Sequence, residues 1–240
     1  MGLRLFMTWG MFLAVPCPLK IWDEKARPKM MACLPVIGLV PGVVWALAAW
    51  LLPKIGCPVS VRGAVLAMIP WLVTGFLHLD GYMDVCDAVL SRRDLATRQK
   101  ILKDSHCGAF AVICMVLLGL SAWSVGQCDG ISPAALLLIP VASRACAALA
   151  VVSLRPLGTS QYAAMTRPGK GMRLWLICCL GAVCLIGLLL GSFAPLAAAL
   201  GYGLACRYGF KNLDGMSGDI SGFALTVGEL VGFAVAGLVG

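Results

Sequence analysis

Charge is scarce in this sequence. Charged residues make up 12% of the 240 residues and apolar residues make up 60%, whereas a soluble globular domain averages about 25% charged residues. A soluble globular protein could not cover its surface with this composition. The sequence therefore predicts an all-α, polytopic integral membrane helical bundle, folded as a single domain over residues 1–240.

Two other patterns are missing. None of the twelve cysteines forms a C-x-x-C pair, the spacing typical of zinc sites and redox centres. Half of them lie in apolar runs, where cysteine acts as a small apolar residue. The net charge of +8 is spread between the apolar runs and forms no basic block. The pattern argues against a nucleic-acid partner and favours membrane lipid and phosphorylated substrates as partners.

Apolar runs near the length of a membrane span, about 20 residues, recur along the chain. They predict six to seven transmembrane helices over about 34–53, 63–79, 107–125, 131–153, 174–193, 195–210 and 221–239. The run LFMTWGMFLAVPCP that follows Arg4 is too short to cross a bilayer. We expect it to be a retained interfacial or re-entrant segment.

Basic residues gather in alternate connections between these runs. The connections at 18–33, 80–106, 154–173 and 207–220 hold most of them, and the opposite connections hold only Lys54 and Arg62. By the positive-inside rule, the first set is cytoplasmic. The sequence thus predicts a protein of the cytoplasmic (inner) membrane whose site loops, about 80–106 and 207–220, face the cytoplasm.

The stretch HLDGYMDVCDA, residues 78–88, holds three of only eleven acidic residues. Asp80, Asp84 and Asp87 are spaced i, i+4, i+7, so all three project from one face if the second span continues as a helix. Their mutual repulsion favours a bound divalent cation, and Mg²⁺ takes one or two carboxylates together with water and substrate phosphate. We therefore expect these acids to be catalytic and metal-binding residues.

A basic stretch, SRRDLATRQKILKDSHCG, follows the three acids. It offers a cationic rim for phosphates, although anchoring on the cytoplasmic side explains residues such as Arg92 equally well. Its end sets Lys103, Asp104 and Ser105 at the mouth of the third span. We expect these four residues to contact substrate.

A glycine-rich turn, NLDGMSGDISG over residues 212–222, precedes the last span. Successive N–H groups of such a turn, leading into a helix N-terminus, form a cradle for an anion. Gly215, Ser217 and Gly218 are therefore candidate substrate-binding residues. Asp219 is a candidate metal ligand beside them.

Two charges and two histidines complete the candidates. Arg144 and Glu229 lie roughly 15 Å deep within predicted spans, where charge is costly unless paired. We expect them to pair across a helix interface or to line a polar cavity together, and both a structural role and a substrate contact stay open. His78 and His106, the only histidines, each adjoin an acid and could act as a general base or be structural.

These motifs occur in one order that resembles the cobalamin synthase family, the adenosylcobinamide-GDP ribazoletransferases. TGFLHLDGYMDVCDA, KDSHCG, the intramembrane Ser143–Arg144 and DGMSGDISG with Gly228–Glu229 carry the resemblance over nearly the whole chain. Several positions depart from the family pattern, and these departures bear on substrate contacts: Ala14, Ala88, His106, Asp214 and Ser217.

The resemblance implies a reaction and its partners. A hydroxyl of α-ribazole, or of its 5′-phosphate, attacks the diphosphate of adenosylcobinamide-GDP, and GMP leaves. It implies one or two Mg²⁺ held by the three acids and Asp219, phosphates held by Lys103 and Arg92, and a proton accepted by an Asp or by His78. Homo-oligomer formation is left open.

Two other functions compete with this interpretation. A CDP-alcohol phosphotransferase also gathers aspartates at cytoplasmic helix ends, but in one contiguous string that is missing here. A cation transporter places acids near the middle of the membrane, whereas only Arg144 and Glu229 lie deep in this sequence.

Overall fold

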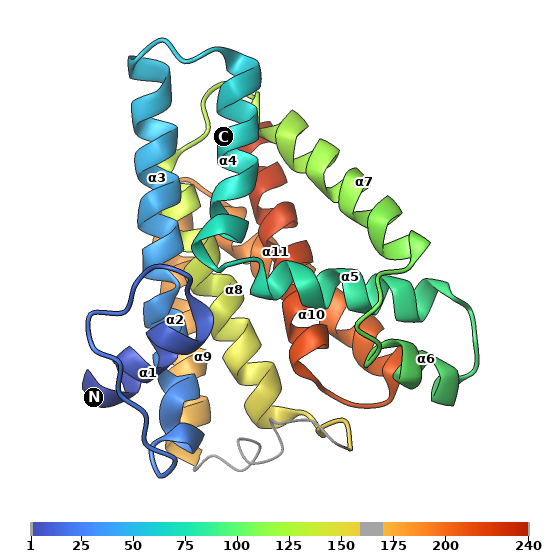
Figure 1. The fold of residues 1–240 in the computed structure, drawn as a ribbon. Helices are drawn as coiled ribbons and strands as arrows, with labels where there is room; N and C mark the ends of the chain where they lie inside the picture. Colours follow the sequence, from blue (N-terminus) through green and yellow to red (C-terminus); the bar gives the residue numbers. More distant parts are fainter. Residues whose placement is uncertain (1, 159–169, 240) are drawn as a thin grey trace.

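The computed structural model describes residues 2–158 and 170–239, and these residues form a helical bundle (Figure 1). Apart from one β-bridge between Pro156 and Met216, their regular structure is helical. The elements are α1 (Gly2–Phe12), the 3₁₀ helix η1 (Arg27–Cys33), α2 (Leu34–Ile37), α3 (Leu39–Lys54), α4 (Val59–Val73), α5 (Leu77–Leu90), α6 (Leu95–Ile101), α7 (Ala109–Gly126), α8 (Pro133–Ser153), α9 (Lys170–Leu189), α10 (Ala194–Leu213) and α11 (Gly218–Leu238).

Five helical segments are long and apolar enough to cross a membrane. They are 27–54, α7, α8, 171–189 and α11, and the bent pair of α4 and α5 raises the number to six. The prediction of a polytopic helical membrane protein is thereby confirmed. The predicted span 195–210 is the 20-residue helix α10, which is not among the five because its sequence is less apolar and carries Arg207 and Lys211.

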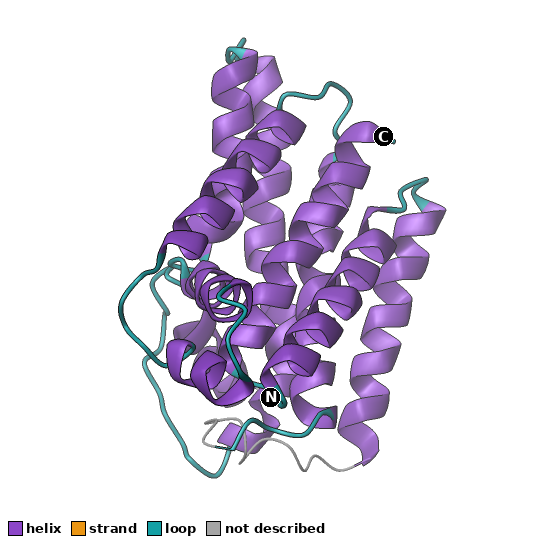
Figure 2. Ribbon diagram, turned by 90° about the vertical axis from the view of Figure 1, so that its right-hand side faces the viewer, coloured by secondary structure: helices purple, strands orange, loops and turns teal. Residues whose placement is uncertain are grey.

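Helix α8 forms the centre of the bundle. It contacts α3, α9, α10 and α11, and 83% of its apolar window is buried within the protein. The corresponding buried share is only 22% for α7 and 17% for 171–189, so these two helices leave most of their apolar surface exposed. Figure 2 shows the long helices running side by side around this core.

The predicted second span, 63–79, does not continue as one helix. Helix α4 ends at Val73, and α5 starts at Leu77 after a bend of 94°, so α5 runs across the bundle (Figure 1). Gly75 and Phe76 both have positive φ, 59° and 63°, which no helix can continue. The hydroxyl of Thr74 meanwhile donates to the carbonyl of Pro70, 2.9 Å away.

The N-terminal segment forms α1, which has 11 residues and is too short to span a bilayer. It packs against η1, where the hydroxyl of Thr8 lies 3.3 Å from the carbonyl oxygen of Met30. Its predicted position at the membrane interface stays a prediction. Of the basic connection 154–173, residues 159–169 lie outside the described part of the chain.

Close packing of α3 on α8 gives the first test. A Cβ atom on Gly42 would overlap the carbonyl oxygen of Leu137, whereas one on Gly119, in α7, would meet nothing within 4 Å. We expect Gly42→Ala to lower the free energy of unfolding by about 1–3 kcal/mol through overpacking. Gly119→Ala should raise it by up to about 1 kcal/mol, since alanine favours the helix. Unfolding curves in detergent measure both, and equal effects would contradict the packing.

Candidate active site

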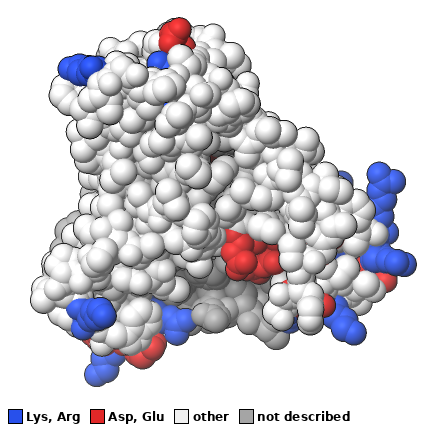
Figure 3. All heavy atoms as spheres, turned by 45° about the horizontal axis from the view of Figure 1, so that its top comes forward, with Lys and Arg blue, Asp and Glu red and all other residues white. Residues whose placement is uncertain are grey.

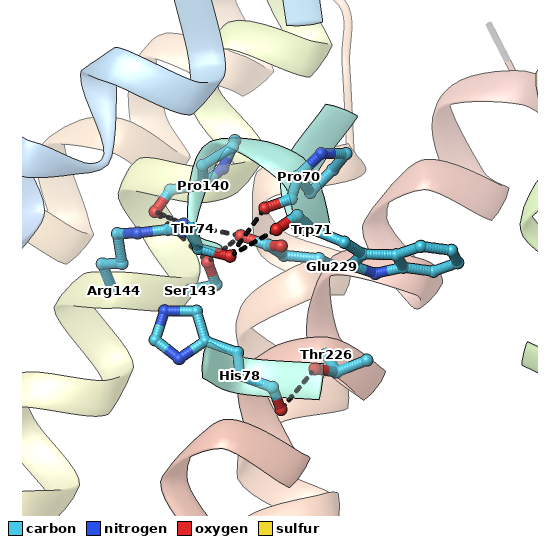
Figure 4. Close-up of polar contacts among 9 residues, drawn as sticks. All are labelled: Pro70, Trp71, Thr74, His78, Pro140, Ser143, Arg144, Thr226 and Glu229. Carbon is cyan, nitrogen blue, oxygen red and sulfur yellow. Dashed lines mark hydrogen bonds and ion pairs between the residues drawn. The ribbon is translucent and has the colours of Figure 1, made fainter. Parts of the chain in front are cut away.

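Two glycines let α5 and α11 cross with their backbones in contact. A Cβ atom on Gly81 would lie 2.8 Å from the Cα of Asp219, and one on Gly222 would lie 2.9 Å from the carbonyl oxygen of His78. The hydroxyl of Thr226 donates to that same carbonyl at 3.2 Å (Figure 4). The crossing therefore brings Asp80, the neighbour of Gly81, to the first turn of α11.

A pocket of about 390 Å³ lies beside this crossing. The residues predicted from sequence that line it are His78, Asp80, Lys103, Ser217, Gly218 and Asp219. Asp80 is exposed and Asp219 is half-buried. The two acids, 139 positions apart in sequence, thus face one cavity.

The other two acids of α5 lie near this cavity without lining it. The charges of Asp80, Asp219 and Asp87 all act on the Asp84 carboxylate, so Asp84 lies near all three. Asp87 lies against Gly108, the residue before α7, where a Cβ atom would overlap its carboxylate. Figure 3 shows acidic side chains gathered in a hollow of uncharged surface, with most basic side chains at the periphery.

The acids fit a magnesium site of the kind that takes few protein ligands. Among the described residues, no group of three or more His, Cys, Asp or Glu is close enough to hold a metal ion. Mg²⁺ needs only one or two carboxylates when water and substrate phosphate complete its shell. Asp80 and Asp219 face the pocket together and supply two carboxylates. These residues could therefore bind Mg²⁺, and the bound metal stays a prediction.

The glycine-rich turn gives the pocket the N-terminus of α11. The Ser217 hydroxyl accepts a hydrogen bond from the N–H of Ile220 and lies 3.3 Å from a carboxylate oxygen of Asp219. Other N–H groups of this first turn lack helical partners and can face an anion. Gly215 has a different role: a Cβ atom there would lie 2.7 Å from the Cα of Leu157, so it allows a close backbone contact.

Only part of the basic stretch that follows the three acids lies at the pocket. Lys103 lines it, whereas Arg92 is exposed two residues beyond the end of α5 and does not. Asp104 and Ser105 are also exposed and outside the lining. The substrate contacts predicted for these three residues remain predictions.

His106, one of the residues that depart from the family pattern, pairs with Asp104. Its Nδ1 lies 2.6 Å from Oδ1 of Asp104, and its backbone N–H donates to the same oxygen. The hydrogen bond to Asp104 raises the pKa of His106, and the same bond lowers the pKa of Asp104. Both groups are exposed, so the pair is a local feature of the loop before α7.

Arg144 and Glu229 form the predicted pair across α8 and α11. Nη1 of Arg144 lies 2.6 Å from Oε1 of Glu229, and the two side chains are 0% and 7% exposed. The hydroxyl of Ser143 donates to the same oxygen at 3.0 Å (Figure 4). The pair lies one turn beyond Ala147 and Leu225, which line the pocket. It therefore sits behind the pocket wall, and its predicted substrate contact is untested.

Sequence reasoning missed the wall contributed by the N-terminal segments. Phe12, Arg27, Met31 and Leu34 line the pocket although they precede the first motif by more than 40 residues. The one available signal was the basic charge of Arg27 in a connection predicted to share the side of the acids. Arg27 thus joins Lys103 as a cation at the pocket.

The family model described as cobalamin-5-phosphate synthase matches residues 4–237. The chain belongs to the cobalamin-5-phosphate synthase family. Among its relatives, the adenosylcobinamide-GDP ribazoletransferase of Clostridium perfringens (strain 13 / Type A) is 38% identical over 243 residues, covering 97% of this chain and 96% of that protein. The enzyme of the same name from Clostridium botulinum (strain Alaska E43 / Type E3) is 36% identical over 95% of this chain and 94% of its own length. No solved structure matches the chain.

Membership of the cobalamin-5-phosphate synthase family confirms the resemblance drawn from the motifs. A less similar relative, the adenosylcobinamide-GDP ribazoletransferase of Halalkalibacterium halodurans, is 32% identical over 94% of this chain and 92% of its own length. The matched range covers α5, α8 and α11, the helices that form the acid pocket and the buried ion pair.

The buried pair gives a test by charge exchange. Arg144→Met should lower the free energy of unfolding by about 3–5 kcal/mol, because it leaves Glu229 buried and unpaired. Exchanging both charges, Arg144→Glu with Glu229→Arg, should restore much of that loss. Expression level and thermal unfolding in detergent measure both, and a double variant as unstable as the single one would count against the pairing.

The pair of His106 and Asp104 gives a second test, by NMR titration of His106. His106 should titrate above the usual histidine pKa of about 6.5, because the Asp104 carboxylate favours the protonated ring. Asp104→Asn should return it toward that value, while Asp94→Asn, an exposed acid in the same loop region, should leave it in place. An unchanged His106 pKa in Asp104→Asn would disprove the pairing.

Proposed function

We propose that this protein transfers the adenosylcobinamide phosphoryl group from adenosylcobinamide-GDP to a ribose hydroxyl of α-ribazole or its 5′-phosphate, releasing GMP. This is the last stage of cobalamin assembly. The family match over residues 4–237 carries the proposal. A pocket in which two acids face two cations and a helix N-terminus supports it, since transfer from a diphosphate needs each of these groups.

The pocket residues divide the chemistry between them. The ribose hydroxyl gives its proton to a carboxylate or to His78, which also lines the pocket. The hydroxyl oxygen then forms a bond to the phosphorus attached to cobinamide, and the bond from that phosphorus to the GMP oxygen breaks, leaving its electron pair on GMP. Lys103, Arg27 and the N-terminus of α11 would hold the phosphate oxygens.

Asp80 and Asp219 would hold a Mg²⁺ at the same place, with Asp84 and Asp87 adding negative charge near it. A bound Mg²⁺ supplies neutralisation of charge on the phosphate oxygens and the leaving group. The basic connections on the side of the pocket support a site facing the cytoplasm. A corrinoid too large for the pocket would then lie at the inner face of the cytoplasmic membrane.

The proposal is tested by GMP release in a detergent-purified preparation given adenosylcobinamide-GDP and α-ribazole, with and without Mg²⁺. We expect metal-dependent GMP and a new corrinoid. Asp80→Asn should lower the rate by about 10²-fold or more, because Asp80 faces the pocket beside Asp219, where the diphosphate and Mg²⁺ would be held.

Asp94→Asn is the matched control, since asparagine also caps a helix and Asp94 caps α6 away from the pocket. It should keep the wild-type rate. A folded wild-type protein that releases no GMP would overturn the proposal and return attention to CDP-linked lipids as substrates.

A further inference from the structure

The candidate pocket is polar at one end and apolar at the other. Where Gly81 packs on Asp219, the lining consists of Asp80, Asp219 and Ser217. Further along α11, His78 packs on Gly222 and its carbonyl accepts from Thr226. The lining of α11 continues to Leu225, so the pocket follows this helix for about 12 Å.

The inner end offers aromatic and aliphatic surface. The rings of Phe12 and His78 are nearly parallel, at 20°, with centroids 6.4 Å apart, and both line the pocket. Ala147 and Leu225, each 2% exposed, line it from α8 and α11. A flat, largely apolar ring system is the chemical group that such a surface favours.

Size and polarity discriminate between the proposed substrates. A pocket of about 390 Å³ is at the small end of the range for small-molecule sites, about 300–1,000 Å³, and is far too small for a corrin ring with its side chains. Guanine is small enough, but its edges carry several hydrogen-bonding groups. Beside its apolar side chains, this part of the lining offers Nε2 of His78, which is buried without a hydrogen-bond partner, and the Ser221 hydroxyl. Most of the edge groups of guanine would therefore be buried without partners, at about 1–3 kcal/mol each. The benzimidazole base of ribazole has a single free ring nitrogen and otherwise carbon edges.

We propose that this pocket binds the acceptor, α-ribazole, an inference that rests on the proposed function. The ribazole base lies in the apolar end against Phe12, His78 and Leu225, and its ribose hydroxyls point toward Asp80 and Asp219. The corrinoid and guanosine parts of the donor stay outside, and only the diphosphate reaches the mouth. The pocket therefore selects acceptors whose base has few polar edge atoms.

The test is a comparison of KM values for the two substrates. Ala147→Leu fills the apolar end, so we expect it to raise the KM for α-ribazole about tenfold or more while the KM for adenosylcobinamide-GDP stays unchanged. Ala150→Leu, on the same helix but outside the lining, should change neither value. α-Adenosine, which shares the α-glycosidic linkage of α-ribazole but has a base with polar edges, should be a poorer acceptor by about tenfold or more.

A second variant distinguishes the loss of acceptor binding from misfolding of Ala147→Leu. Leu225→Ala removes apolar contact and should likewise raise the KM for α-ribazole alone. Leu230→Ala, five residues further along α11 and outside the pocket lining, is its control. A rise in the KM for adenosylcobinamide-GDP alone, or equal use of α-adenosine and α-ribazole, would overturn the acceptor site while GMP release still supports the transferase. No GMP release from the folded wild type would instead refute the proposed function beneath it.

Discussion

The backbone contact between α5 and α11 is the constraint on which the rest of the site depends. It exists because Gly81 and Gly222 carry no side chain at the crossing. It aligns Asp80 with Asp219, sets His78 against α11 and leaves the pocket open between these helices and α8. A larger residue at either position would move an entire helix, so the acids depend on glycines that have no chemistry of their own.

Sequence predicted the elements whose physics is local. The runs 107–125, 131–153 and 221–239 correspond closely to α7, α8 and α11, because a helix that crosses a membrane needs about 20 apolar residues. The break between α4 and α5 was missed. TGFLHL stays apolar through it, and the left-handed conformation of Phe76 has no signature in residue type, unlike that of Gly75.

The candidate site, too, could be predicted only in part from the sequence. Helical spacing put the three aspartates on one helix, and the cost of buried charge predicted the pairing of Arg144 with Glu229. The wall formed by Phe12, Met31 and Leu34 could not be predicted, since it depends on how α1 and η1 fold back onto distant helices. Such long-range packing leaves no periodic trace in the sequence.

The ion pair between Arg144 and Glu229 also has a consequence for the order in which the helices insert into the membrane. Arg144 precedes Glu229 by 85 positions, so α8 enters the bilayer well before its partner charge has been synthesised. An unpaired arginine at the centre of a helix costs about 2.5–3.5 kcal/mol on insertion, which the apolar residues of α8 must offset in the interval. Arrival of α11 ends that interval and delivers Asp219 in the same event. Charge neutralisation and assembly of the acid pocket are thus completed together, when α11 joins α8.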